Sequence, residues 1–190
     1  MFLIVGLGNP GKEHENTRHN IGFKVIEELA KRIGIKNLKV KCKAFIGTGE
    51  IEGKKVILAE PQTFMNLSGE SVRDLLNWYK LSVDRLILIY DDADLDVGEL
   101  RLRRGGGGAG HKGVESVIAC IGSTEFIRVR IGIGRESLEA DITDYVLQEI
   151  PLIQKDIIDK AIFNAADATL CILNQGLEGA MNKFNRMKAE

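Results

Sequence analysis

A histidine lies in a polar stretch between the first expected strand and the first expected helix. The strand is the apolar run at residues 2–5, and the stretch TRHN at 17–20 contains His19. Clefts in open α/β sheets form at the carboxyl ends of strands. The positive end of a helix disfavours imidazolium, and a neutral imidazole can act as a general base. His19 is therefore a candidate base, and a surface or helix-capping histidine is the equal alternative from position alone.

A run of acids, DDADLD, directly follows the apolar run LILIY at residues 86–90, which predicts a central strand. Such a run is usually solvated or binds a cation. Its first acid, Asp91, lies at the same expected sheet edge as His19, where a carboxylate would fix the tautomer of the imidazole. No convincing nucleophile completes a triad, because Ser68 is not in a G-x-S-x-G elbow and Cys42 lies in a polar region. The pair therefore predicts direct attack by water.

Metal binding is the competing interpretation of these acids. The three histidines show no HxxxH or HxH spacing, and the three cysteines are far apart and form no CxxC pair. We therefore expect no metal site. Three scattered cysteines favour a reducing compartment over a disulfide framework.

The stretch GLGNPG at residues 6–11 fits the dinucleotide fingerprint G-x-G-x-x-G. That fingerprint needs a helix that opens at once and an acid about 20 residues later, at the end of a second strand. Pro10 and the polar residues 12–18 delay the helix, and residues 28–40 offer no strand ending in an acid. A nucleotide-dependent oxidoreductase is thus the weaker alternative to a tight loop that presents Asn9.

Two further stretches could bind a substrate. In PQTFMNLSG at 61–69, Phe64 and Met65 are either core residues or an apolar wall at the sheet edge, where Asn66 offers a donor and an acceptor to a peptide. The second stretch begins with three arginines, Arg101, Arg103 and Arg104, and continues as GGGGAGHKG at 105–113. It is not a P-loop, and it is either a phosphate clamp or a mobile lid with a solvated basic rim. Because the net charge is -1, any nucleic-acid contact must come from such a local patch.

The elements that position these residues alternate between strands and helices. Further strands are expected at 44–51, 55–60, 99–103 and 126–133, and helices at 19–33, around 72–79, around 114–121, and from 152 to about Lys188 with a break at Gly176. Asn66 or Ser68 is the expected N-cap of the second helix.

The pattern predicts an α/β fold: one domain over residues 1–190, a three-layer sandwich with a twisted mixed β-sheet between helices. No apolar stretch reaches 18 residues and no signal peptide is evident, which predicts a cytoplasmic protein without a membrane span.

Taken together and in order, these motifs resemble one family, the bacterial-type peptidyl-tRNA hydrolases. The matching stretches are GLGNPG at 6–11, TRHN at 17–20, PQTFMNLSG at 61–69, YDDADL at 90–95, RLR and GHKG within 101–113, and RVRIGIGR at 128–135, and DYVL at 144–147 also fits. The resemblance implies a monomeric enzyme that hydrolyses the ester between peptide and tRNA in prematurely released peptidyl-tRNA and so recycles the tRNA. A non-catalytic RNA-binding relative of the same fold is the alternative.

The resemblance also implies roles for single residues. His19 would be the general base, oriented by Asp91, with no metal or cofactor. Asn9, Met65 and Asn66 would contact the peptide or the terminal nucleotide. Arg101 and Arg103, with Arg104 beside them, would bind tRNA phosphate.

Three positions depart from the family pattern. His14 stands where a tyrosine is usual, Lys112 where an asparagine is common, and Asp96-Val97 where prolines are common. His14 and Lys112 are still expected among the substrate-binding residues. In the family, the asparagine at the position of Lys112 helps to hold the water or the oxyanion. Lys112 therefore either stabilises the oxyanion by its charge or points to solvent and helps the arginines to hold RNA.

Overall fold

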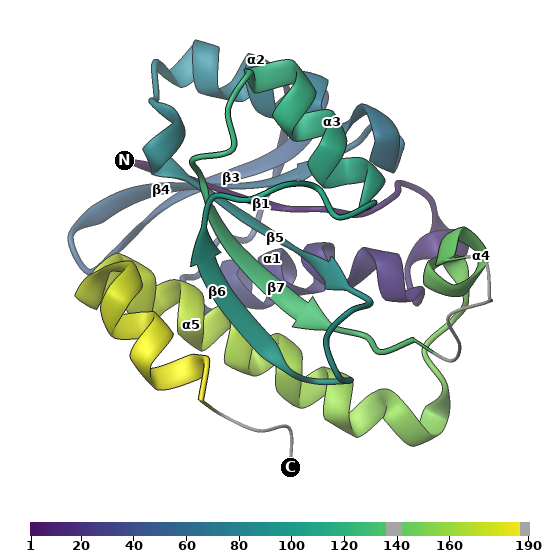
Figure 1. Ribbon diagram of the computed structural model, residues 1–190. Coiled ribbons are helices and arrows are strands. Elements are labelled where there is room, and N and C mark those ends of the chain that lie inside the picture. The colour runs from purple at the N-terminus through teal and green to yellow at the C-terminus, as the bar shows by residue number, and fades with distance from the viewer. Residues whose placement is uncertain (136–141, 187–190) are drawn as a thin grey trace.

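The computed structural model describes residues 1–135 and 142–186, and in this part of the chain seven strands form one sheet between two helical layers (Figure 1). The strands are β1 Phe2–Gly6, β2 Lys39–Lys41, β3 Ala44–Ile51, β4 Lys54–Pro61, β5 Leu86–Asp92, β6 Leu100–Arg104 and β7 Ile127–Gly132. The helices are α1 Ile21–Arg32, α2 Ser68–Tyr79, α3 Lys112–Ile121, α4 Ile142–Leu147 and α5 Leu152–Phe184. The predicted α/β class with a mixed sheet is confirmed.

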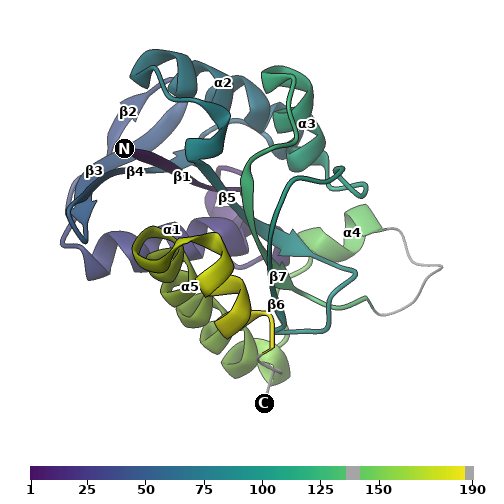
Figure 2. The same cartoon turned by 60° about the vertical axis from the view of Figure 1, so that its left-hand side comes forward.

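The strand order is β2-β3-β4-β1-β5-β7-β6. The four strands β4, β1, β5 and β7 are parallel, whereas β2, β3 and β6 pair antiparallel at the two sides of the sheet. The carboxyl ends of the four parallel strands therefore meet at one edge. Figure 2 shows α4 beside this edge, close to the ends of β5 and β7.

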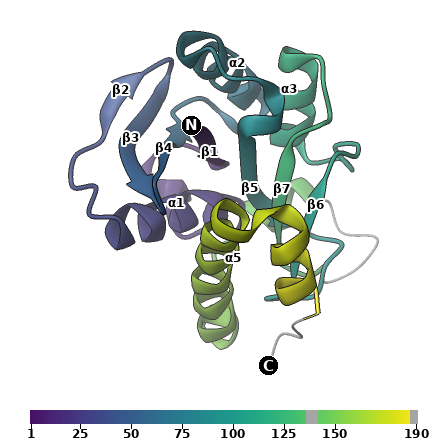
Figure 3. The ribbon, with the colours of Figure 1, turned by 90° about the vertical axis from the view of Figure 1, so that its left-hand side faces the viewer.

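The core consists of two layers because side chains alternate across each strand. In β1, Ile4 packs toward α1 and α5, whereas Leu3 and Val5 pack toward α2 and α3. Figure 3 shows the two pairs of helices on opposite faces of the sheet. Covered on both faces, β5 is buried along its whole length, which explains why its sequence is continuously apolar up to the two aspartates.

The local structure around the two candidate catalytic residues differs slightly from the prediction. The helix α1 begins at Ile21, and His19 lies in a 3-10 turn just before it, Arg18–Asn20. The strand β5 extends through Asp91 to Asp92, so Asp91 belongs to the sheet and not to a loop. Both residues are therefore held by regular backbone structure.

One expected helix end also differs. The N-cap of α2 is Leu67, without a side-chain cap, so the prediction of Asn66 or Ser68 is wrong, because a 3-10 turn runs directly into the helix. The helix α5 breaks at Gly176, as predicted, where the backbone has φ 81 and ψ 169, and it ends at Phe184. The predicted end near Lys188 lies outside the described residues. Within the described residues, no helix is long and apolar enough to cross a membrane.

The strand β4 carries a buried carboxyl group, that of Glu60. Glu60 on β4 is 6% exposed, and its Oε1 atom has no hydrogen-bond partner among the described residues. Burial, and to a lesser extent repulsion by Glu27, raises the pKa of Glu60 to about 8. The folded protein therefore holds a proton on Glu60 at pH values where the unfolded chain has lost it.

This raised pKa predicts that folding stability falls with pH. Between pH 4.5 and about 8, the free energy of unfolding should lose about 1.4 kcal/mol per pH unit through Glu60, and nothing further above that range. Glu60→Gln should match the wild type at pH 5 and be more stable at pH 8.5 in urea denaturation. Glu50→Gln, at an exposed position of β3, is the control. Parallel stability curves for wild type and Glu60→Gln would show that Glu60 does not titrate in this way.

Candidate active site

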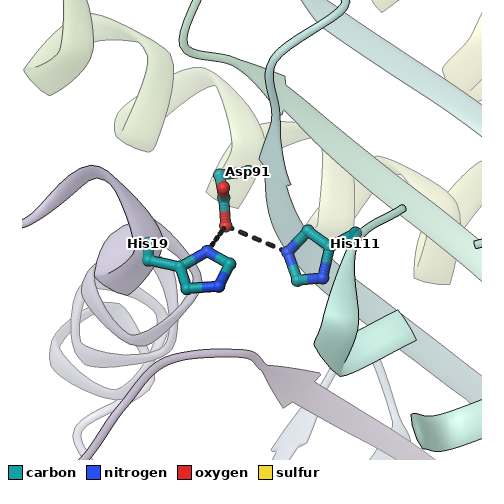
Figure 4. A group of neighbouring side chains, drawn as sticks. All are labelled: His19, Asp91 and His111. Atoms are coloured by element: carbon teal, nitrogen blue, oxygen red, sulfur yellow. Dashed lines mark hydrogen bonds and ion pairs between the residues drawn. The ribbon is translucent and has the colours of Figure 1, made fainter. Parts of the chain in front are cut away.

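His19 and Asp91 meet at the carboxyl edge of the sheet, as predicted. The Nδ1 atom of His19 lies 2.8 Å from Oδ1 of Asp91, and both side chains are buried (Figure 4). A carboxylate can only accept, so Nδ1 carries the proton and donates it to Asp91. This tautomer leaves a lone pair on Nε2 of His19, which is the atom that a general base needs.

A second histidine, His111, binds the same carboxylate oxygen. Its Nε2 lies 3.1 Å from Oδ1 of Asp91, and Figure 4 shows the two imidazoles on either side of the carboxylate. His111 also caps α3, because its Nδ1 accepts from the backbone N–H groups of Gly113 (3.1 Å) and Val114 (3.3 Å). With Nδ1 as acceptor, Nε2 must carry the proton and donate to Asp91. His111 was missed by the sequence reasoning, although its place between a glycine run and an apolar helix is a capping signal.

The environment of Asp91 keeps it ionised. Burial raises the pKa of this carboxyl, but attraction to His19 and His111 and their hydrogen bonds lower it further, so the pKa lies below its usual range. The carboxylate is therefore a permanent negative charge beside His19. Such a charge stabilises the imidazolium that forms when His19 takes a proton.

The same three residues are a possible metal-binding group. Ligand atoms of His19, Asp91 and His111 all lie within 4.8 Å of one another. In the hydrogen-bonded arrangement, however, the two nitrogens that face Asp91 carry the protons that they donate. An ion there would have to displace both protons, so the hydrogen bonds do not favour a metal, and its absence stays a prediction.

The site opens into a pocket of about 520 Å³. The pocket is lined by four of the predicted substrate-binding residues as well as by the dyad: Asn9, Met65, Asn66, Lys112, His19 and Asp91. Phe64, which is 62% exposed, forms part of the wall, as do Ile142, Val146 and Leu147 of α4. The structure thus brings together segments from residue 9 to residue 147 that are far apart in the sequence.

Hydrogen bonds fix the orientation of Asn9. Its Oδ1 accepts from the backbone N–H of Met65 at 2.7 Å, and its own backbone N–H and C=O bind the side chain of Asn20, both at 2.9 Å. The Nδ2 group of Asn9 has no partner among the described residues. Asn9 can therefore offer an oriented N–H donor to a ligand in the pocket.

The wall formed by α4 is held by the residue next to His19. Arg18 is buried and donates to the carbonyl of Glu149 at 3.2 Å, and its guanidinium lies 4.2 Å from the ring centroid of Tyr145. A β-bridge joins Thr17 to Glu149 beside it. The sequence reasoning assigned no role to Arg18, because burial of a charged side chain cannot be seen in a motif.

The glycine-rich loop is also held by a buried arginine. Arg128 on β7 is 2% exposed and donates to the backbone carbonyls of Gly106 and Gly107, the latter at 2.6 Å. These bonds fix the start of the loop that leads to His111. The loop is therefore tied to the sheet at this point.

The predicted phosphate-binding arginines lie on β6, outside the pocket lining. Arg101 is engaged by Glu99 at 2.5 Å and by the carbonyl of Asn185. Arg104 donates to the carbonyl of Glu125 at 3.3 Å. Arg103 and Arg104 are exposed, and neither forms an ion pair with a described residue, so their charges are more available to a ligand than that of Arg101, which is paired with Glu99.

The two departures from the family pattern that were expected to bind substrate, His14 and Lys112, lie in different places. His14 does not line the pocket, and its Nε2 lies 3.9 Å from a carboxylate oxygen of Glu13. Lys112 lies on the pocket lining as the first residue of α3, with a side chain that is 68% exposed and an Nζ 3.9 Å from Glu115. Substrate binding by these two residues stays a prediction.

Comparison with known proteins gives one consistent result. A family model described as peptidyl-tRNA hydrolase matches residues 3–190. The peptidyl-tRNA hydrolase of Carboxydothermus hydrogenoformans is 50% identical over 186 residues, covering 98% of this chain and 99% of that protein. That of Thermoanaerobacter sp. (strain X514) is 49% identical over 185 residues, covering 97% and 100%. The crystal structure of peptidyl-tRNA hydrolase from Acinetobacter baumannii superposes with a TM-score of 0.94 at 36% identity, covering 100% of this chain and 97% of that one.

Proposed function

Because the chain belongs to the peptidyl-tRNA hydrolase family and is an ester hydrolase of peptidyl-tRNA, we propose that His19 is the base that activates the attacking water. The observation that carries this proposal is the bond between His19 and Asp91, which leaves Nε2 unprotonated on a side chain that lines the pocket of about 520 Å³. The resemblance in sequence left two hypotheses, a hydrolase and a non-catalytic RNA-binding relative of the same fold. Membership of the family supports the hydrolase.

The reaction proceeds by direct attack of water. Nε2 of His19 takes one proton while the water oxygen bonds to the ester carbonyl carbon. The intermediate then loses the ribose oxygen of tRNA, which receives the proton back from His19. The products are a peptide with a free carboxyl group and a tRNA with a free hydroxyl group. Asp91 keeps His19 in the required tautomer and stabilises its cationic form, while Asn9 and Asn66 provide amide donors for the substrate carbonyls.

The test of this function uses purified protein and an N-blocked aminoacyl-tRNA. We expect release of the N-blocked amino acid at a rate proportional to enzyme concentration, above the spontaneous hydrolysis of the ester. Retention of this activity in protein dialysed against a chelator would support the expected absence of a metal. An uncleaved substrate that nevertheless binds would instead support a non-catalytic RNA-binding protein.

We also propose that the chain is a single domain over residues 1–190 and works as a cytoplasmic monomer on its partner, peptidyl-tRNA. In support of a single domain, one seven-stranded sheet contains all the strands of the described residues. Analytical ultracentrifugation of the active protein addresses the oligomeric state.

The arginines of β6 are proposed to contact tRNA phosphates. Arg101→Ala/Arg103→Ala should weaken tRNA binding and reduce its salt dependence, since each phosphate contact contributes about 0.7–0.9 to the slope of log K against log salt. Arg103→Ala alone should account for most of the change, because Arg101 is already paired with Glu99. Arg32→Ala, whose guanidinium is occupied by Glu28 and Asp167, is the control for loss of one charge. An unchanged salt slope in the double variant would contradict the contact.

Lys112 is proposed to contact phosphate and not the oxyanion. Its exposed side chain lies in water, where a charge has little effect on a buried reaction. Lys112→Met should therefore keep its kcat and lose tRNA affinity. If Lys112→Met instead lowers kcat by about 10²–10³, the loss of one oxyanion donor, and Lys112→Asn restores it, Lys112 acts in catalysis.

A further inference from the structure

A second pocket, of about 300 Å³, adjoins the reaction pocket, and Asn9 lines both. It lies between the loop that follows β1, the first half of α1, and the ends of β3 and β4. Three acids from these separate elements line it: Glu15, Glu27 and Glu60. The reaction described above uses none of them.

Glu60 gives this pocket its chemical character. As described above, its side chain is more than nine-tenths buried and its Oε1 has no partner among the described residues. A buried polar atom without a partner is unfavourable and uncommon in native proteins. A ligand that pairs with this oxygen would remove the penalty.

We propose that this pocket is a subsite for a lysine or arginine side chain of the peptide, carried within three residues of the ester. The inference rests on the proposed function. Lys12 and Lys24 also line the pocket, but the buried group without a partner is the carboxyl of Glu60. As a carboxylate, Glu60 can pair with a cationic side chain of the peptide and cannot pair with a phosphate of the tRNA. Phe23 and Phe45 also line the pocket and can pack against the apolar stem of such a side chain.

The register of the sheet places this subsite within reach of the ester. Val5 of β1 pairs with Ala59 of β4 on one side and with Leu88 of β5 on the other. Glu60 and Asp91 therefore lie on strands either side of β1, about 10 Å apart across the sheet and about 7 Å apart along it. Glu60 comes two residues after Leu58 and Asp91 two residues after Ile89, and Leu58 and Ile89 both pack toward α1, so Glu60 and Asp91 face the same side of the sheet. The resulting separation of roughly 12 Å is spanned by one or two extended residues and a long side chain.

The charges that face Glu60 give cation binding a distinct pH dependence. Lys24 and Glu27 approach from α1 and Lys12 and Glu15 from the loop, while β3 contributes only Phe45. In the empty pocket Glu60 is protonated below about pH 8. Because a bound cation favours the carboxylate, binding releases a proton. Affinity for the cation must then rise with pH up to about 8 and remain level above it.

The experiment compares N-blocked tripeptidyl-tRNAs that carry lysine or norleucine at each of the three peptide positions in turn. The ratio of kcat/KM for lysine over norleucine is measured at pH 6.5 and 8.5 for wild type, Glu60→Gln and the control Glu50→Gln, with the spontaneous rate subtracted. Glu60→Gln keeps the shape of the side chain, so its folding is not in question. A ratio is used because it cancels any general effect on activity.

At pH 8.5 we expect wild type and Glu50→Gln to prefer lysine by roughly tenfold at one position, the effect of one hydrogen bond to a charged group. The preference should fall by up to about tenfold per pH unit below pH 8 and be absent in Glu60→Gln. A wild-type ratio near one at all positions would overturn the subsite while leaving the hydrolase intact. An equal loss for both substrates in Glu60→Gln would also overturn it, because the pocket would then hold the common nucleoside. If neither substrate is hydrolysed, the proposed function itself fails.

Discussion

His19→Ala is expected to lower kcat by about 10²–10⁴-fold, the usual contribution of a general base, while tRNA affinity changes little. The reason is that His19 lines the pocket and Nε2 is its unprotonated nitrogen, because Nδ1 carries the proton that it donates to Asp91. His111 cannot replace it, because both of its nitrogens are occupied by Asp91 and by the start of α3. Steady-state kinetics with N-blocked aminoacyl-tRNA, together with a direct tRNA-binding measurement, checks this result.

The binding measurement separates loss of chemistry from loss of folding. A His19→Ala protein that binds tRNA as the wild type does, and melts at a similar temperature, has kept its structure. If its kcat stays within about threefold of wild type, far below the expected contribution of a base, another group must activate the water.

Asp91→Asn should produce the second large loss, of at least about 10²-fold in kcat, because an amide in place of the carboxylate favours the wrong tautomer of a catalytic histidine. Oδ1 of Asp91 accepts from both His19 and His111. An asparagine removes the negative charge, and its NH₂ group donates hydrogen bonds and cannot accept one from a histidine. The positive charge that develops on His19 would then lack its buried counter-ion.

The matched control is Asp159→Asn at an exposed position of α5, which removes one carboxylate far from the dyad in sequence and outside the pocket lining. It should leave kcat unchanged. An Asp91→Asn protein as active as this control would show that His19 needs neither the charge nor the fixed tautomer.

The strands could be predicted well because turns and apolar runs mark their ends. For β3 the predicted and observed bounds agree, since the turn at Glu52 and Gly53 has positive φ at both residues (49 and 72), as tight hairpins require. The strand β2 was missed because its three residues, KVK, are largely exposed and carry no periodic signal. The helix α4 was missed because six residues are too few for a helical period to show.

The dyad could be predicted because His19 follows β1 and Asp91 lies near the end of β5, and the carboxyl ends of these two strands share one edge. The supporting residues could not, since their roles depend on burial. Charged side chains are exposed by default, so nothing in the sequence shows that Arg18 and Arg128 are buried supports of the site or that Glu60 lies in a pocket. The loop that leads to His111 is fixed to β7 by Arg128, a contact that motif spacing does not reveal.

The most direct test of the central claim, that His19 and Asp91 act as one catalytic unit, is a double-mutant cycle on the single-turnover rate of peptidyl-tRNA hydrolysis. Wild type, His19→Ala, Asp91→Asn and the double variant are compared with enzyme in excess over substrate. Since Asp91 acts only through His19, the double variant should be no slower than His19→Ala alone, as residues that act as a unit are strongly non-additive. If the two losses instead multiply in the double variant, Asp91 contributes independently of His19 and the dyad mechanism is wrong.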